Sequence, residues 1–174
     1  MEQPFIIEPK VFKDSRGHFF ESYNKLNSKL VNFNFVQDNV SKSSYGTLRG
    51  LHIQNLGHTQ SKLVTCLAGS IIDTIVDVRS GHDYGKIYQY ELNDKNFNQL
   101  LVPKGFVHGF SVISDFAIVQ YKCDEYYNKE SEQGFHPLSF ELDIDWNLSK
   151  DDIILSDKDN MLPEFIHKTF FEID

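Results

Sequence analysis

Short runs rich in Val, Ile, Leu and aromatic residues recur along the chain, and Gly, Pro, Asn or Asp separates each run from the next. The clearest runs cover residues 61–68, 70–78, 86–92, 99–102, 106–113 and 116–123. Such β-branched, often alternating runs favour strands, whereas helical periodicity is confined to residues 24–31 and the last thirty residues. The chain is therefore predicted to be all-β, a sandwich or barrel with small peripheral helices.

The organisation of the chain predicts one domain over residues 1–174, because that length can bury a single core and no repeat, linker or low-complexity tract divides it. Cys66 and Cys123 lie in separate apolar runs, so we expect two buried free thiols in a reducing compartment. The first residues lack the pattern of a signal peptide, and no apolar run approaches the roughly 20 residues that a membrane span needs. These features predict a cytoplasmic protein.

The charge of the chain limits its partners. A formal net charge of −8 argues against nucleic acid and anionic membranes, which require basic surfaces. Only three of the 17 basic residues are Arg, and two of them, Arg16 and Arg49, directly precede a glycine. Guanidinium binds phosphate bidentately and glycine allows close approach, so the pair indicates an anion site; the alternative is that both cap turns in surface ion pairs.

Two histidines are candidates for chemistry. Imidazole suits proton transfer near neutral pH, so His52 and His108 are either acid–base groups or structural hydrogen-bonding residues. Neither belongs to a His-x-His pair, since Gln54 and Phe110 occupy the positions two residues later. Local spacing therefore does not bring three imidazoles together, and we expect no metal.

Three further residues stay open on pattern alone. Tyr121 lies in an alternating run and is consistent with a core tyrosine. Tyr127 follows the end of that run, where it either covers the core edge or stacks on a base. Asp159 lies in what reads as a solvated acidic turn, and its position alone does not indicate catalysis.

Taken in order, several segments resemble the dTDP-4-dehydrorhamnose 3,5-epimerase family, a branch of the cupins that acts on dTDP-4-keto-6-deoxyhexoses. The matching segments are residues 14–21, 37–39, 48–52, 62–64, 76–79, 103–110, 121–122 and 155–159. Each is weak alone, but their order over one domain is specific. The resemblance implies a cupin-like jelly-roll β-sandwich, a homodimer, no cofactor, and inversion at C3 and C5 of the sugar.

The resemblance also assigns roles. His52 would remove a proton made acidic by the C4 carbonyl, and Asp159 would orient its imidazole. Lys62 would stabilise the C4 oxyanion, and Tyr121 would donate a proton from the opposite face. The residues implied to hold the diphosphate and sugar are Arg16, Gln37, Arg49, His108 and Lys158, with Glu21, Tyr127 and Glu132 toward the nucleoside.

Other functions remain open at this point. One is a single-centre 3- or 5-epimerase acting on a related nucleotide sugar, because such enzymes of the family keep the same base. Another is a metal-dependent cupin oxygenase or isomerase, and a third is a non-catalytic binding module. Ile53 stands directly after His52 where the family usually has an aromatic residue, so we expect it to influence the orientation of the sugar.

Overall fold

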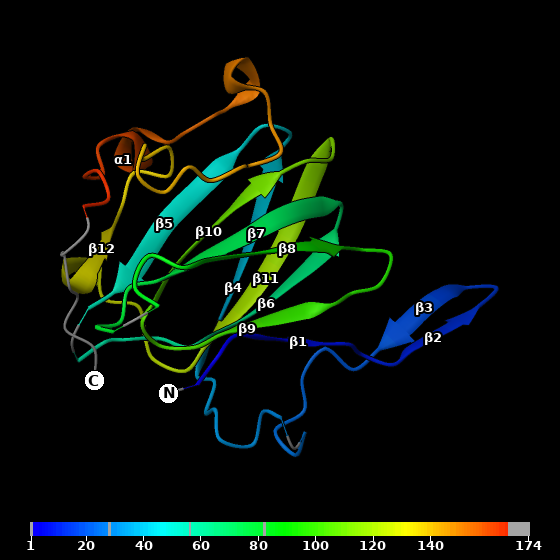
Figure 1. The fold of residues 1–174 in the computed structure, drawn as a ribbon. Helices are drawn as coiled ribbons and strands as arrows, with labels where there is room; N and C mark the ends of the chain where they lie inside the picture. Colours follow the sequence, from blue (N-terminus) through cyan, green and yellow to red (C-terminus); the bar gives the residue numbers. More distant parts are fainter. Residues whose placement is uncertain (1, 28, 56, 82, 167–174) are drawn as a thin grey trace.

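In the computed structural model, which describes residues 2–27, 29–55, 57–81 and 83–166, two antiparallel sheets of five strands pack face to face (Figure 1). The first sheet has the order β1 (Phe5–Ile7), β9 (Gln99–Val102), β6 (Lys62–Ala68), β11 (Phe116–Cys123) and β4 (Gln37–Ser44). The second has the order β12 (Glu132–Gly134), β5 (Leu48–Gln54), β10 (Phe106–Val112), β7 (Ser70–Asp77) and β8 (Ile87–Asn93). The chain crosses repeatedly between the sheets, which confirms the predicted jelly-roll sandwich.

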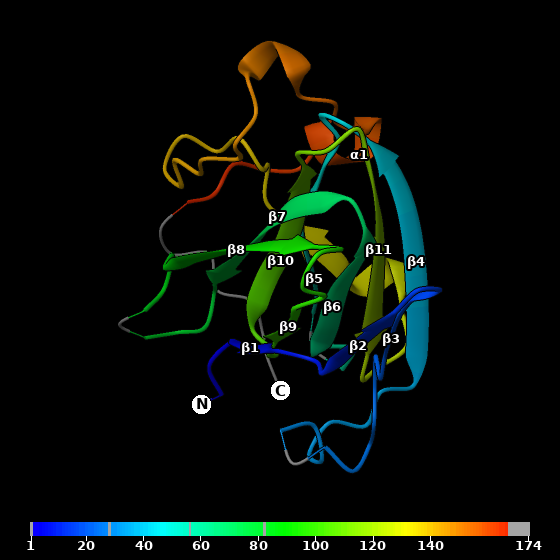
Figure 2. The same ribbon diagram turned by 90° about the vertical axis from the view of Figure 1, so that its right-hand side faces the viewer.

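Strand alternation creates two apolar layers. The inner faces of both sheets meet in a core that includes Val64, Ile71, Leu100 and Val119, all of them fully buried. A second cluster lies on the outer face of the second sheet, where the chain after β12 covers it (Figure 2). The cluster contains Leu51, Ile53, Val76, Val107, Phe135, Leu142, Trp146 and Phe165. Both faces of β5, β7 and β10 are thus covered by other parts of the chain.

Three strands of the second sheet approach one another unusually closely around Gly50. Gly50 has a φ of +113°, and a Cβ there would lie 2.6 Å from the Cα of Gly109 and 2.7 Å from the carbonyl oxygen of His108. A Cβ at Gly134 would lie 1.9 Å from the carbonyl oxygen of Leu51. Glycine is required at these positions because the backbones fill the space of a side chain.

A two-stranded hairpin, β2 (Val11–Asp14) and β3 (Gly17–Phe20), projects from the sandwich as an arm (Figure 1). Its aromatic residues Phe12 and Phe19 are 52% and 69% exposed. An isolated hairpin is only marginally stable in water. Exposed apolar side chains on such an arm are typical of a surface that contacts another protein.

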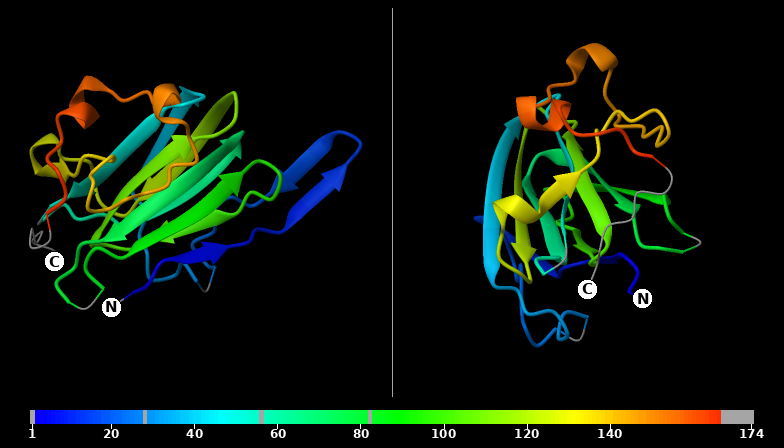
Figure 3. Two further views of the ribbon diagram at one scale, coloured as in Figure 1. Left: turned by 45° about the horizontal axis from the view of Figure 1, so that its top comes forward. Right: turned by 90° about the vertical axis from the view of Figure 1, so that its left-hand side faces the viewer.

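The helical predictions are partly wrong. The described residues of 24–31 form turns, because the side chains of Asn24 and Asn27 accept hydrogen bonds from the backbone N–H groups of Leu26 and Lys29. The small peripheral helices near the C-terminus are confirmed as η2 (Lys150–Asp152) and α1 (Asp157–Asn160), with η1 (Lys129–Ser131) in addition (Figure 3). Residues 167–174 of the predicted helical region lie outside the described residues.

The two cysteines lie inside the sandwich. Cys66 and Cys123 are both buried and free, as predicted. Burial raises the pKa of the Cys66 thiol to about 12, which makes it unreactive at neutral pH. Within the described part of the chain, no helix combines the length and the apolar character needed to cross a bilayer.

We predict that Gly50→Ala lowers the free energy of unfolding by at least about 2 kcal/mol, because the new methyl group must displace the backbone of β10. Gly17→Ala is the matched control: Gly17 also has a positive φ, +136°, but nothing lies within 4 Å of the position of its Cβ. Urea unfolding of both variants separates the steric clash from backbone strain. Equal losses for the two variants would contradict the close-approach argument.

Candidate functional site

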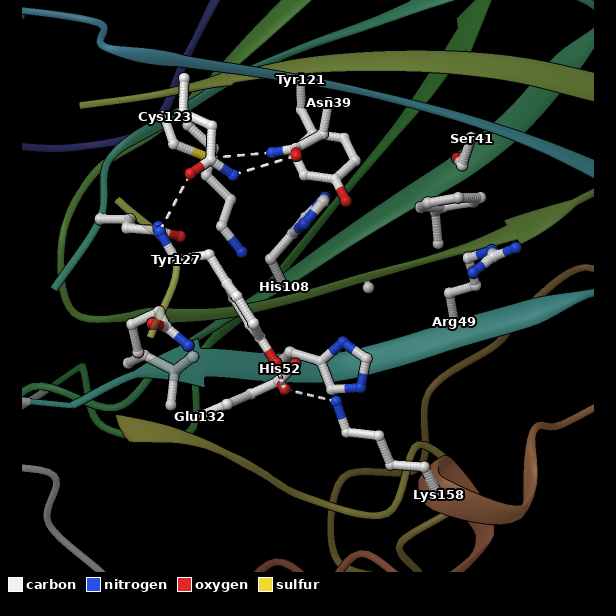
Figure 4. A pocket seen from close by; sticks show the side chains of 17 residues that line it. Asn39, Ser41, Arg49, His52, His108, Tyr121, Cys123, Tyr127, Glu132 and Lys158 are labelled. Atoms are coloured by element: carbon white, nitrogen blue, oxygen red, sulfur yellow. Dashed lines mark hydrogen bonds and ion pairs between the residues drawn. The ribbon is translucent and has the colours of Figure 1, made fainter. Parts of the chain in front are cut away.

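A pocket of about 350 Å³ opens between the two sheets, beside β12 and α1 (Figure 4). Most of its lining residues are of polar types, and they come from six strands, the adjoining loops and α1. The lining residues are Gln37, Asn39, Ser41, Arg49, His52, Ile53, Gln54, Gln60, Lys62, His108, Gly109, Phe110, Tyr121, Cys123, Tyr127, Glu132 and Lys158. Side chains from one sheet therefore face side chains from the other across a single cavity.

His52 and Asp159 form a short hydrogen bond at the wall of this pocket. Nε2 of His52 lies 2.6 Å from Oδ1 of Asp159, and the side chains are 26% and 6% exposed. With its Nε2 proton donated to the carboxylate, the neutral ring has the free lone pair on Nδ1. The pair thus has the arrangement of a histidine base oriented by a carboxylate.

Short-range structure fixes Asp159 in place. The side chain of Ser156 caps α1 by accepting a hydrogen bond from the backbone N–H of Asp159, at 3.1 Å. Burial acts to raise the pKa of the Asp159 carboxyl, but hydrogen bonds from His52, Ser156 and the backbone of Gly50, with the charge of His52, lower the pKa below its usual value. Asp159 is therefore a carboxylate at neutral pH, not a solvated turn residue.

Lys62 and Tyr121 come from the first sheet and approach the pocket from the side opposite His52. Burial lowers the pKa of the Lys62 ammonium, against the opposing influence of Cys123, Glu132 and Asp73. Burial also raises the pKa of the Tyr121 phenol, so this side chain keeps its proton at neutral pH. The pocket thus combines a base on one wall with a proton donor and a cation on the other.

A polar network lies at the mouth of the pocket. One carboxylate oxygen of Glu132 accepts hydrogen bonds from the hydroxyl of Tyr127, at 2.7 Å, and from the ammonium of Lys158. Burial acts to raise the pKa of Glu132, but Lys158, Tyr127 and the charge of His52 lower it overall. Gln37 accepts a hydrogen bond from the backbone N–H of Tyr127, at 3.0 Å, and so ties β4 to this network.

Two more basic groups are held by neighbouring side chains. Nε of Arg49 donates to the hydroxyl of Ser43 at 3.0 Å, which leaves the other guanidinium nitrogens available to a ligand. Nε2 of His108 lies 3.0 and 2.9 Å from the two carboxylate oxygens of Asp73. Both basic side chains line the pocket, as Figure 4 shows.

Two of the residues implied to bind substrate are not in this pocket. Arg16 lies at the tip of the arm, forms a 2.5 Å ion pair with Asp14 and is 88% exposed. Glu21 follows the arm and lines a different hollow, with Phe12 and Phe19. Within one described chain, Arg16 therefore matches the alternative of an exposed ion pair at a turn.

Two lining residues on β4, Asn39 and Ser41, were not predicted to bind substrate. They alternate with the predicted Gln37 on the inner face of that strand, so period-two spacing from Gln37 could have identified both. Asp73 was also missed, although an acidic residue inside an otherwise apolar strand is a signal in itself. Ile53, expected to influence the orientation of the sugar, borders the pocket and also packs in the outer apolar cluster.

Within the described ranges, no three His, Cys, Asp or Glu side chains come together as a group that could hold a metal ion. The side chains that are brought together suit proton abstraction from an anionic ligand. They provide a base, a proton donor, a half-buried ammonium and further cations.

Comparison with known proteins gives consistent matches. The family model described as dTDP-4-dehydrorhamnose 3,5-epimerase matches residues 1–167. The Escherichia coli dTDP-4-dehydrorhamnose 3,5-epimerase is 43% identical over 93% of this chain and 89% of that protein. The crystal structure of the Elizabethkingia anophelis enzyme of the same name has a TM-score of 0.87 and 49% identity, covering 97% of this chain and 94% of that one.

A further solved structure carries a ligand. It is the Legionella pneumophila dTDP-6-deoxy-D-glucose-3,5-epimerase in complex with dTDP-4-keto-L-rhamnose. Its TM-score is 0.84 at 42% identity, and the match covers 94% of both chains.

We predict that Asp159→Asn destabilises the protein by roughly 1–3 kcal/mol at pH 7, because it removes a buried hydrogen-bonded charge. The folded protein lowers the pKa of Asp159, so its contribution is present above the unfolded-state pKa and is lost as pH falls through the folded pKa. The difference from wild type should therefore shrink below about pH 4.

Urea unfolding between pH 3 and 8 measures this difference. Asp157→Asn is the control, because it removes a carboxylate from an exposed position of the same helix. A pH-independent loss for Asp159→Asn would contradict the charge argument.

Proposed function

The chain belongs to the dTDP-4-dehydrorhamnose 3,5-epimerase family, and on this basis we propose how its pocket inverts C3 and C5 of a dTDP-linked 4-keto-6-deoxyhexose. The observation that carries the proposal is the placement of the His52–Asp159 pair on one wall of the pocket and Tyr121 on the other. Inversion requires a proton to leave one face of a carbon and another to arrive on the opposite face. Two opposed walls meet that requirement.

Proton abstraction is assigned to Nδ1 of His52. The C4 carbonyl acidifies the hydrogens at C3 and C5, so the electron pair of the broken C–H bond moves into an enolate with its charge on the C4 oxygen. Asp159 stabilises the imidazolium that forms, and Lys62 stabilises the oxyanion. The Tyr121 phenol then protonates the carbon from the other face. Once water has taken the proton from His52 and returned one to the Tyr121 phenolate, the same steps at the second carbon complete the reaction.

The remaining pocket residues hold the nucleotide. Arg49 and Lys158 supply positive charge for the diphosphate, and Lys158 is available once the ligand competes with Glu132. Tyr127 offers an aromatic face at the pocket mouth for the base, with Glu132 beside it. Gln37 and His108 complete the contacts with the sugar and diphosphate.

The arm supports a homodimer. It exposes Phe12 and Phe19 and places Arg16 outside the pocket of its own chain. β4 is an edge strand of the first sheet, with Val40 64% exposed, and offers unpaired backbone groups to a second copy. In our proposal the arm packs on a partner subunit and brings Arg16 and Glu21 to the partner's pocket. The enzyme forms a single domain and acts in the cytoplasm.

We predict that incubation with dTDP-4-keto-6-deoxyglucose in D2O introduces deuterium at C3 and C5. His52→Ala should lower this exchange at least about 1,000-fold while dTDP binding is retained, because the variant lacks the base but keeps the nucleotide contacts. Mass spectrometry and proton NMR of the sugar measure the exchange. Full exchange by the variant would require a different base.

Tyr121→Phe is the comparison variant, because it removes one hydroxyl from the opposite wall. It should slow net inversion more than proton loss, since solvent can partly replace the donor. Exchange at one carbon alone would show a single-centre epimerase, and no exchange by the wild type would refute the epimerase function. Stoichiometric Fe, Mn or Zn in the active protein would instead indicate a metal-dependent cupin.

The dimer proposal predicts complementation between two variants that are impaired in different ways. Arg16→Ala should raise KM about tenfold or more, because it removes a phosphate contact. A mixed dimer of Arg16→Ala and His52→Ala chains contains one pocket with both His52 and the partner's Arg16. Co-expression of the two chains should therefore restore about a quarter to a half of the wild-type activity per dimer, measured at low substrate concentration. Measured activity equal to the average of the two separate variants would contradict an arm that acts in the partner's pocket.

A further inference from the structure

Asp73 is a carboxylate enclosed by the core of the sandwich. It lies on β7 between Ile71 and Ile75 on the inner face, and its exposure is 0%. Both of its oxygens lie within 3.0 Å of Nε2 of His108. Burying a carboxylate is costly, and an apolar residue of similar size would fit an apolar strand, so packing alone does not account for an acid here.

The charge balance of this pair indicates the form of His108. A neutral imidazole would leave the net negative charge of Asp73 in a low-dielectric core. An imidazolium gives a neutral pair, with its Nε2–H directed at the carboxylate. His108 is itself only 7% exposed, so solvent does little to replace this compensation.

The position of His108 places it beside His52, the proposed base. His108 on β10 is the direct register partner of His52 on β5, so both side chains stand on the same inner face. Figure 4 shows His108 between His52 and Tyr121. Its Nδ1 has no hydrogen-bond partner among the described residues, and the side chain lines the pocket.

The same carboxylate acts on a second pocket cation. Burial lowers the pKa of Lys62, and the negative charge of Asp73 acts in the opposite direction by raising that pKa. No described carboxylate forms an ion pair with Lys62. Asp73 therefore supplies negative charge from behind the pocket wall for two groups that line the pocket, His108 and Lys62.

On the basis of the epimerase function, we propose that Asp73 is a positioning residue that holds His108 as an imidazolium, with Nε2–H toward the carboxylate and Nδ1–H toward the C4 oxygen of the sugar. His108 and Lys62 then form a two-donor oxyanion site. This site is preorganised because Asp73 fixes the ring before substrate binds. The interaction strengthens as the carbonyl oxygen becomes an enolate oxygen, so its effect falls on kcat more than on KM.

The test is Asp73→Asn, which keeps the size of the side chain and an oxygen that can accept from Nε2–H, but removes the charge. We expect kcat to fall about 100-fold, with KM and dTDP affinity within about threefold of wild type. Asp77→Asn is the matched control. Asp77 is a buried carboxylate on the same strand, paired with Arg79 and absent from the pocket lining, so its loss should reduce stability without this loss of kcat.

Nitrogen-15 NMR of the histidine rings reads the proposed state directly, without any turnover. The His108 signals, assigned by their disappearance in His108→Gln, should show both ring nitrogens protonated in wild type and a neutral ring in Asp73→Asn. Wild-type His108 remains informative even if Asp73→Asn does not fold. The double variant Asp73→Asn with His108→Gln should be no slower than His108→Gln alone, because Asp73 acts through His108.

Three results would overturn the proposal: a neutral His108 ring in the wild type, a folded Asp73→Asn with nearly unchanged kcat, or a loss confined to KM. These results can be distinguished from a failure of the proposed epimerase function. A wild type that exchanges no sugar protons refutes the epimerase, whereas the ring spectrum still decides whether Asp73 holds an imidazolium.

Discussion

The close approach of β5, β10 and β12 is the constraint on which the site depends. Because Gly50, Gly109 and Gly134 have no side chains, the three backbones pack tightly and set the register that places His52 beside His108. The backbone N–H of Gly50 also donates to Asp159, so the same contact orients the carboxylate behind the base. A shift of about 1 Å in this region would separate the base from its partner and from the sugar.

Charge is distributed so that an acidic protein can bind an anionic nucleotide. The chain has a net charge of −8, yet its described pocket lining contains Arg49, Lys62 and Lys158 with Glu132 as the one acid. The compensating carboxylates, Asp73 and Asp159, lie behind the wall and not on it. This arrangement presents donors to the ligand while Asp73 and Asp159 each keep a histidine partner, which limits the cost of burying the two carboxylates.

The sequence predicted the strands well, because β-branched runs and glycine breaks report a local preference. It failed for residues 24–31, where Asn24 and Asn27 bond to nearby backbone and replace helix by turns. Asp159 could be assigned only through resemblance, since its contact with His52 spans 107 residues. The position of Arg16 on an arm likewise depends on how distant strands pair, which composition and spacing do not specify.

The two His–Asp pairs show why similar chemistry needs different burial. In the proposed mechanism His52 releases its proton between turnovers, and its 26% exposed side chain gives water access to the ring. The His108 and Asp73 side chains, 8% and 0% exposed, exclude water, so that pair can keep a fixed charge. Strand alternation directs most of the Ile53 side chain to the outer cluster, although Ile53 also borders the pocket that His52 lines.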